Sequence, residues 1–368
     1  MTLKRILALL LAAAMALTLF ACGKQAEPAG SSGSGGYEES PEDINESNYQ
    51  KAVAFENEGE LFKAVAAYRK CLDYKDSHEK VKTLCNRINS LSSICGSDHI
   101  VGLKSNGTVI AIGDNSNGEC NTFNWTNIVS VSTSLLHTVG LKDDGTVVAT
   151  GSNNGGECKV SGWSDIVAVS AGNGSTVGLK SDGTVVAAGY NEYGERNVSD
   201  WTDIVAVSTS GPHTVGLKSD GTVVAAGCNY SSQCCVGDWS DIVAISAGTA
   251  YYGWLENGHT VGLRSDGTVV AVGYNNNGQC NISDWSDIVA ISTSDSHTLG
   301  LKSNGIVVAT GRNDYGQCNV SDWSDIIAIH ADVGGSIGLK SDGAVIAIGN
   351  NSYTQLLATN WTDIKTAF

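Results

Sequence analysis

The feature that most constrains the fold is a segment that repeats seven times between residue 96 and the end of the chain. Each copy contains Gly-Leu followed by Lys or Arg, and a tryptophan follows each. Successive tryptophans stand 38 residues apart, except for one interval of 46 residues that contains an insertion. Seven copies of this length predict a propeller or a solenoid, in which each copy packs only against its neighbours. The tryptophans are Trp125, Trp163, Trp201, Trp239, Trp285, Trp323 and Trp361.

One copy predicts four strands. Residues 203–208, 213–218 and 222–227 are expected strands, and a short fourth strand is expected in the stretch before the tryptophan. Ser-Asp-Gly between the second and third strands predicts a two-residue type I′ turn. The middle strands are apolar or small on both faces, so each sheet needs cover on both sides. Blades around an axis provide it, so we expect a mainly β protein with a seven-bladed propeller of four-stranded antiparallel blades at 93–368.

The repeats resemble those of the regulator of chromosome condensation family. Residues 213–227 read HTVGLKSDGTVVAAG, residues 273–279 read GYNNNGQ, and equivalents of both recur in register over 96–368. The resemblance implies a seven-bladed propeller and a binding role. Residues 363–368 match a first strand, whereas the stretch before His99 matches poorly. We therefore expect 363–368 to supply the innermost strand of the first blade.

The N-terminus predicts export. Lys4 and Arg5 precede an apolar stretch that is too short for an ordinary membrane span. Its end, LFAC, resembles the bacterial lipobox, which implies a signal peptide at 1–21 and a lipid on Cys22. The alternative is plain secretion with cleavage near Ala21. A Gly/Ser-rich, acidic stretch at 22–44 predicts a flexible tether. We expect a bacterial lipoprotein on the outer side of the cytoplasmic membrane, which touches the membrane only through its lipid.

A helical segment is expected at 45–92. Its apolar residues stand at helical spacing, Asn-Glu-Gly-Glu at 57–60 separates two helices, and Asp76 or Ser77 can cap a third. The spacing resembles a tetratricopeptide unit. One unit cannot form the groove that longer arrays use for peptides, so we expect a spacer or a cap on the propeller, with peptide binding as the alternative.

The repeated polar residues predict structure rather than catalysis. Five histidines share one repeat position, and blades would spread them around a circle, whereas metal ligands must converge. Five cysteines share another position, which predicts free thiols in small apolar slots. The aspartates fall in turns. We therefore expect that the protein is not an enzyme and that it binds neither a metal ion nor a cofactor. The net charge of −16 argues against nucleic acid as a partner. The histidines are His99, His137, His213, His259 and His297, and the cysteines are Cys120, Cys158, Cys234, Cys280 and Cys318.

The candidate site is one rim of the ring. Antiparallel strands place the loop between strands one and two on the same rim as the stretch after strand three. These two segments vary between copies, whereas the opposite turns barely change. The varied residues are rich in tyrosine, which is frequent in binding surfaces. The candidate residues are Leu135, Leu136, Tyr190, Tyr193, Tyr230, Tyr251, Tyr252, Trp254, Leu255, Glu256, Tyr274, Arg312, Tyr315 and Tyr353.

The insertion at 247–259 holds five of these candidates. We expect it to anchor a binding rim; the alternative is a plug over the channel or the neighbouring blade. The first hypothesis is that the protein is a monomer that binds an extracellular protein. The second is a lectin-like module for cell-wall or host glycans, because aromatic rings stack on sugars. An enzyme is the third.

Overall fold

A computed structural model describes residues 40–59, 61–89, 93–248, 258–352 and 355–366. Residues 41–368 form one compact unit with three α-helices, seven β-sheets and a terminal 3-10 helix among the described residues. The expected signal peptide at 1–21, Cys22 and most of the expected tether at 22–44 lie outside the described residues. None of the described helices is both long enough and apolar enough to span a membrane.

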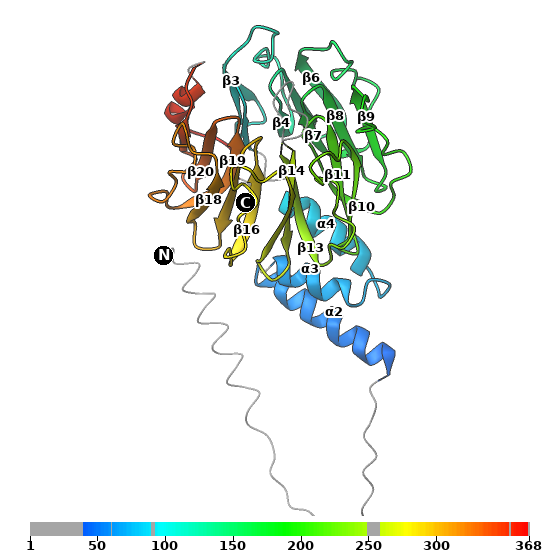
Figure 1. The fold of residues 1–368 in the computed structure, drawn as a ribbon. Coiled ribbons are helices and arrows are strands. Elements are labelled where there is room, and N and C mark those ends of the chain that lie inside the picture. Colours follow the sequence, from blue (N-terminus) through cyan, green and yellow to red (C-terminus); the bar gives the residue numbers. More distant parts are fainter. Residues whose placement is uncertain (1–39, 60, 90–92, 249–257, 353–354, 367–368) are drawn as a thin grey trace, which may run out of the picture. The chain divides into compact units, whose positions relative to one another are not determined.

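The helical segment begins earlier than expected. Helices α2 (Pro41–Asn57), α3 (Leu61–Arg69) and α4 (Ser77–Asn89) follow one another (Figure 1), so residues 41–44 are helix rather than tether. Gly59 takes a φ of 79° between α2 and α3, which permits the sharp reversal there. Three helices and their breaks agree with the apolar spacing. Likeness to a tetratricopeptide unit stays a prediction.

Each blade is a three-stranded antiparallel sheet whose strands follow chain order. The first strands are β1 (Ile94–Gly96), β4 (Ile128–Thr133), β7 (Ile166–Gly172), β10 (Ile204–Thr209), β13 (Ile242–Gly248), β16 (Ile288–Thr293) and β19 (Ile326–Asp332). The second strands are β2 (His99–Leu103), β5 (His137–Lys142), β8 (Ser175–Lys180), β11 (His213–Lys218), β14 (His259–Arg264), β17 (His297–Lys302) and β20 (Gly335–Lys340). The third strands are β3 (Val109–Gly113), β6 (Val147–Gly151), β9 (Val185–Gly189), β12 (Val223–Gly227), β15 (Val269–Gly273), β18 (Val307–Gly311) and β21 (Val345–Gly349).

The expected fourth strand is wrong. The stretch before each tryptophan forms consecutive turns, and in the last blade it forms the 3-10 helix η2 (Gln355–Asn360). Short backbone bonds hold these turns: the N–H of Val198 donates to the carbonyl of Arg196, and the N–H of Trp201 donates to that of Val198. Backbone groups that are paired locally are not free to extend a sheet ladder.

The expected type I′ turn is also wrong. In the turn after β5, the N–H of Gly145 donates to the carbonyl of Lys142, and only the glycine has a positive φ, 78°. The N–H of Lys142 in turn donates to the carbonyl of Thr146, which is the pattern of a type I turn with a bulged glycine. Asp144 favours this turn because its Oδ1 accepts both the N–H and the hydroxyl of Thr146.

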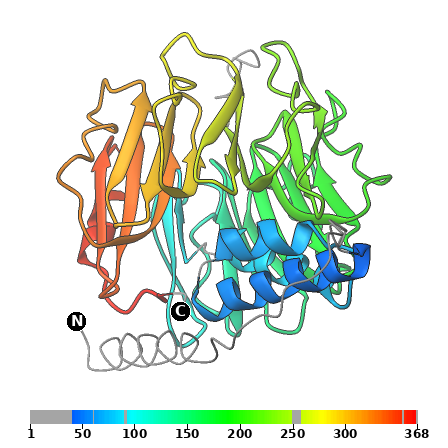
Figure 2. The same cartoon turned by 90° about the horizontal axis from the view of Figure 1, so that it is seen from below.

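The first strands contact one another in sequence order, and β1 also contacts β19, so the blades form a ring. In Figure 2 the red C-terminal end lies beside the cyan first strands. The expected role of 363–368 is only partly right. Residues 94–96 form most of the innermost strand of the first blade, while Ile364 pairs with Lys104 at its beginning. This one strand position is therefore filled by both ends of the chain.

Every seam between blades repeats the same packing. The tryptophan that ends one copy lies on the glycine of Gly-Leu-Lys in the next blade; a methyl group on Gly216 would lie 2.7 Å from Trp201 Cζ3. The last tryptophan, Trp361, packs in the same way on Gly102 of the first blade. The expected inter-blade role of the tryptophans is confirmed, and Trp361 closes the ring.

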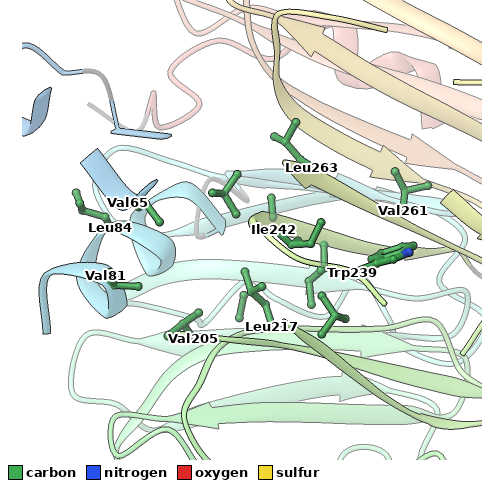
Figure 3. Close-up of a cluster of buried hydrophobic side chains, with 14 of the residues drawn as sticks. Val65, Val81, Leu84, Val205, Leu217, Trp239, Ile242, Val261 and Leu263 are labelled. Atoms are coloured by element: carbon green, nitrogen blue, oxygen red, sulfur yellow. The ribbon is translucent and has the colours of Figure 1, made fainter. Parts of the chain in front are cut away.

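Helices α3 and α4 pack against two middle blades. Figure 3 shows Val65, Val81 and Leu84 facing a cluster that includes Val205 and Ile242. Arg69 Nε donates to the carbonyl of Ser219 at 2.9 Å, and Lys82 Nζ donates to that of Ser181 at 3.2 Å. Both carbonyls belong to turns between second and third strands. The helices therefore cover part of that side of the ring, at the blades that they contact.

Candidate functional site

Backbone bonds show which loops share a rim. The residue that follows each third strand donates its N–H to the loop that precedes the second strand, as Tyr190 does to Gly174 and Arg312 does to Ser296, both at 2.9 Å. All seven blades repeat this bond. We call the surface made by these two sets of segments the variable rim: residues 97–98, 134–136, 173–174, 210–212, 258, 294–296 and 333–334, and residues 114–122, 152–160, 190–198, 228–236, 274–282, 312–320 and 350–352. The expected placement of these loops on one rim is confirmed.

Tyr190 joins two blades on the variable rim. Its ring lies on Gly155 and Gly174: a methyl group on either glycine would come within 2.7 Å of ring carbon Cδ2. The two glycines therefore make room for a flat aromatic ring, which remains 40% exposed. The ring therefore packs against the two glycines and remains partly open to solvent.

Tyr193, in the same segment as Tyr190, packs against Tyr230 of the next blade. Their ring centroids lie 6.4 Å apart in an edge-to-face arrangement, a favourable geometry for aromatic pairs. Tyr230 is 71% exposed, although its neighbour Tyr193 is half-buried. An aromatic side chain so exposed contributes little to the core and is available to a partner.

Tyr315 and Arg312 form a second exposed pair on the rim. The guanidinium lies 5.9 Å from the Tyr315 ring centroid and makes an ion pair with Asp314 at 2.6 Å, which raises the pKa of Arg312. Tyr315 also lies beside Gly334 of the neighbouring blade. Tyr274 is half-buried.

Leu135 does not belong to the exposed surface. It is buried and lines a central cavity of about 230 Å³ between the first strands. Its contact with a partner stays a prediction. Leu136 is half-buried. The apolar side chain of Leu135 turns inward because its loop lies at the mouth of the cavity. The candidates Tyr251, Tyr252, Trp254, Leu255, Glu256 and Tyr353 lie outside the described residues.

The repeated histidines bind neighbouring blades together. His137 Nε2 lies 2.8 Å from Thr176 Oγ1 of the next blade, and that hydroxyl donates its hydrogen to the carbonyl of Glu157. The imidazole must therefore donate from Nε2 and accept at Nδ1, where Ser134 Oγ lies at 2.7 Å. Burial lowers the pKa of His137 to about 4, so the ring is neutral. The local bond was expected; the bond across the seam was not.

The repeated cysteines are not in closed apolar slots. Cys158 is half-buried, and its thiol donates to the carbonyl of Ser152 at 3.1 Å. The same bond recurs in four other blades, and all five thiols are free. Burial raises the pKa of Cys158 to about 11, so the thiol stays protonated and keeps donating. In the third blade Arg196 replaces the cysteine and donates to the carbonyl of Gly189.

Sequence comparison of the copies missed a polar group at the seam between the last and first blades. His330 stands where five other first strands carry serine, and Asp332 stands where Ser134, Ser210 and Ser294 stand. Both line the central cavity. These departures from the repeat were visible in the sequence, but nothing in it indicated that they face one channel.

Among the side chains that the structure describes, no group of three or more His, Cys, Asp or Glu is arranged to hold a metal ion. The five repeated histidines are separated by their blades, as shown by their bonds to five different neighbours.

Comparison with known proteins identifies the repeat. The sequence profile of the Regulator of chromosome condensation (RCC1) repeat matches residues 95–119, 128–157, 166–195, 257–279 and 288–317. No curated protein sequence matches the chain.

Solved structures with a similar fold include RCC1-like propellers. The receptor kinase CR4 ectodomain of Physcomitrella patens superimposes with a TM-score of 0.57 and 17% identity, covering 70% of this chain and 73% of that one. Prp20p of Saccharomyces cerevisiae, described with its binding to Gsp1p and histones, has a TM-score of 0.55 and 15% identity, covering 78% of this chain and 87% of that one. The CRINKLY WD40 ectodomain of the Arabidopsis thaliana receptor kinase ACR4 has a TM-score of 0.55 and 18% identity, covering 72% of this chain and 96% of that one. The chain contains RCC1 repeats and has an RCC1-like propeller fold.

Proposed function

Starting from an RCC1-like repeat propeller, we propose that the protein is an exported, lipid-anchored binding module that grips another protein through its variable rim. The supporting observation is the aromatic surface of Tyr190, Tyr193 and Tyr230, which spans two blades and remains open to solvent. Tyrosines supply a large contact area with little loss of side-chain freedom. We call these three residues the tyrosine surface.

The rigidity of the surface supports binding. Tyr190 rests on two glycines and Tyr193 packs edge-on against Tyr230, so part of the ordering has occurred before a partner arrives. Pre-ordered contact residues raise affinity because less entropy is lost on association. Prp20p, a protein of similar fold, is described as binding Gsp1p and histones, which favours a protein as the kind of partner proposed here.

Glycan binding is the second candidate. Tyr230 is exposed and stands beside Asn229 on the rim, and aromatic rings with amide groups also suit sugars. We place it second because neither an open groove nor a row of rings follows from the described contacts. Anchoring through Cys22 and a place outside the cytoplasmic membrane are parts of the same proposal that rest on the N-terminal sequence alone.

The test uses the full chain and a matched pair of substitutions. Tyr230→Ala removes a ring from the tyrosine surface, and Phe123→Ala removes a ring that is 88% exposed on another part of the ring. Cross-linking on intact producing cells identifies protein partners, and a glycan array is read in parallel. We expect Tyr230→Ala to reduce capture of one defined protein while Phe123→Ala retains it. Equal capture by both variants would refute the tyrosine surface as the site, and binding only on the array would favour glycans.

A further inference from the structure

The seam between the last and first blades differs from five of the other six seams. In five seams a serine of one first strand accepts an N–H from the next, as Ser292 does from Ala331 at 2.8 Å. At the last seam His330 Nε2 instead donates to the carbonyl of Gly96 at 2.9 Å. Asp332 follows on the same face of β19, and its carboxyl accepts the N–H of Val333 and contacts Ser97. Both side chains line the central cavity.

More carboxyl groups lie next to Asp332 on the variable rim. The backbone N–H of Asp114 donates to the carbonyl of Asp98 at 2.9 Å, which places these two residues in adjoining loops. Both are half-exposed. The carboxyl of Asp332 contacts Ser97, the residue before Asp98. Burial raises the pKa of Asp332, and the charge of Asp98 raises it further. Burial also raises the pKa of Asp98, and the charges of Asp114 and Glu119 raise it further.

Two buried acceptors nearby have no partner among the described residues: Glu119 Oε1 and His99 Nδ1. Both side chains are fully buried. The hydroxyl of Thr138 gives its hydrogen to the carbonyl of Glu119, so His99 donates to it from Nε2 and Nδ1 is left as an acceptor. This corner of the rim is therefore rich in acceptors and poor in donors.

We propose that the acidic corner, made of the half-exposed Asp98 and Asp114 and the buried Glu119 and Asp332, receives a cationic side chain of the protein partner, a lysine ammonium or an arginine guanidinium. These two groups carry only donors and a positive charge, which complements a set of acceptors and carboxylates. The carboxyl groups are not arranged tightly enough for a metal ion, and a longer organic cation needs less convergence. The adjoining cavity of about 230 Å³ gives such a side chain room. This inference rests on the proposed function, because the partner reaches the corner by docking on the variable rim.

The internal repeats provide substitutions that each seam already tolerates. Asp98→Ser copies Ser296, Asp332→Ser copies Ser294, and Glu119→Gln copies Gln279, each at the equivalent position of another blade. The control variant, Asp284→Asn with Asp322→Asn, removes two carboxylates from exposed segments outside the variable rim. The test variant is Asp98→Ser with Asp332→Ser, which removes the same number of carboxyl groups.

The probe is a fluorescently labelled tetralysine peptide with blocked termini, and binding is followed by anisotropy at low salt. We expect the test variant to weaken binding about tenfold and the control variant to weaken it less than about twofold. The same peptide with acetylated lysines should not bind. Equal weakening by both variants, or no binding to the unsubstituted chain, would overturn the proposal.

Two further measurements keep the outcomes separate. Thermal melting shows whether the test variant folds. If it does not fold, Asp98→Ser alone replaces it, and we expect a smaller loss of peptide binding. An unchanged peptide affinity of Asp98→Ser would count against the acidic corner. Tyr230→Ala should keep the peptide affinity of the unsubstituted chain. Loss of protein capture with Tyr230→Ala tests the proposed function, whereas the peptide tests only the acidic corner, so either can fail alone.

Discussion

Acid should destabilise the propeller through its buried histidines. Burial lowers the pKa of His99, His137 and His213 to about 4, and that of His259 and His297 to about 3, from the ordinary 6.5. A histidine with a lowered pKa in the folded state takes up its proton mainly on unfolding. Its contribution to stability is therefore present above pH 6.5 and is lost as the pH falls toward the folded-state value.

The loss of unfolding free energy depends on how far the pH lies below 6.5, the ordinary pKa of histidine. At about pH 5 each histidine costs about 2 kcal/mol of unfolding free energy, since one pH unit corresponds to about 1.4 kcal/mol. Five such residues sum to about 10 kcal/mol, which is comparable to the whole stability of a typical domain. Asp332, Asp98 and Asp295 act in the opposite direction, because their raised pKa values favour the folded state as the pH falls, and they offset part of the loss.

The assay is urea unfolding between about pH 7.5 and about pH 5, compared for the unsubstituted chain, His137→Ser and Thr176→Val. Serine occupies the equivalent position in the third blade as Ser175. We expect His137→Ser to be less stable at neutral pH, with a slope against pH shallower by about 1.4 kcal/mol per unit, because one fewer proton is bound on unfolding. Thr176→Val removes the partner of His137 but keeps the imidazole, so it should lower stability and keep the steep slope. An unchanged slope in His137→Ser would refute the assignment of a buried neutral ring.

Five other changes test the packing. Gly216→Ala should lower the free energy of unfolding by about 1–3 kcal/mol because the new methyl group meets Trp201, whereas Gly237→Ala, where nothing lies within 4 Å of the added carbon, should have little effect in urea unfolding. Ser232 holds a φ of 66° where Gly194 and Gly278 stand in other blades, so Ser232→Gly should stabilise by up to about 1 kcal/mol; a lower urea midpoint would count against this strain. Trp361→Ala should lower the free energy of unfolding by about 3–5 kcal/mol because it removes the side chain that packs at the closing seam. Deletion of 363–368 should lower the thermal midpoint as well. Unchanged melting of both variants would contradict ring closure through the C-terminal end.

Much of the fold could be predicted because a repeat fixes its own architecture. The seven copies of the repeat determine the number of blades, and antiparallel strand order determines which segments share a rim. The rim assignment of Tyr190 and Arg312 followed from strand direction alone and is confirmed by their backbone bonds. The turn type and the fourth strand were wrong because short backbone bonds, such as that between Val198 and Arg196, decide such segments locally.

What only the tertiary structure decided lies at the seams. His137 bonds to Thr176, 39 residues further on, and Leu135 turns into the central cavity. The same is true of Asp332, which contacts Ser97 although 235 residues separate them along the chain. A repeat pattern describes one copy at a time, so the sequence could state what each blade contains. Which side chains meet depends on the angle and spacing at which blades pack, and only the closed ring sets these.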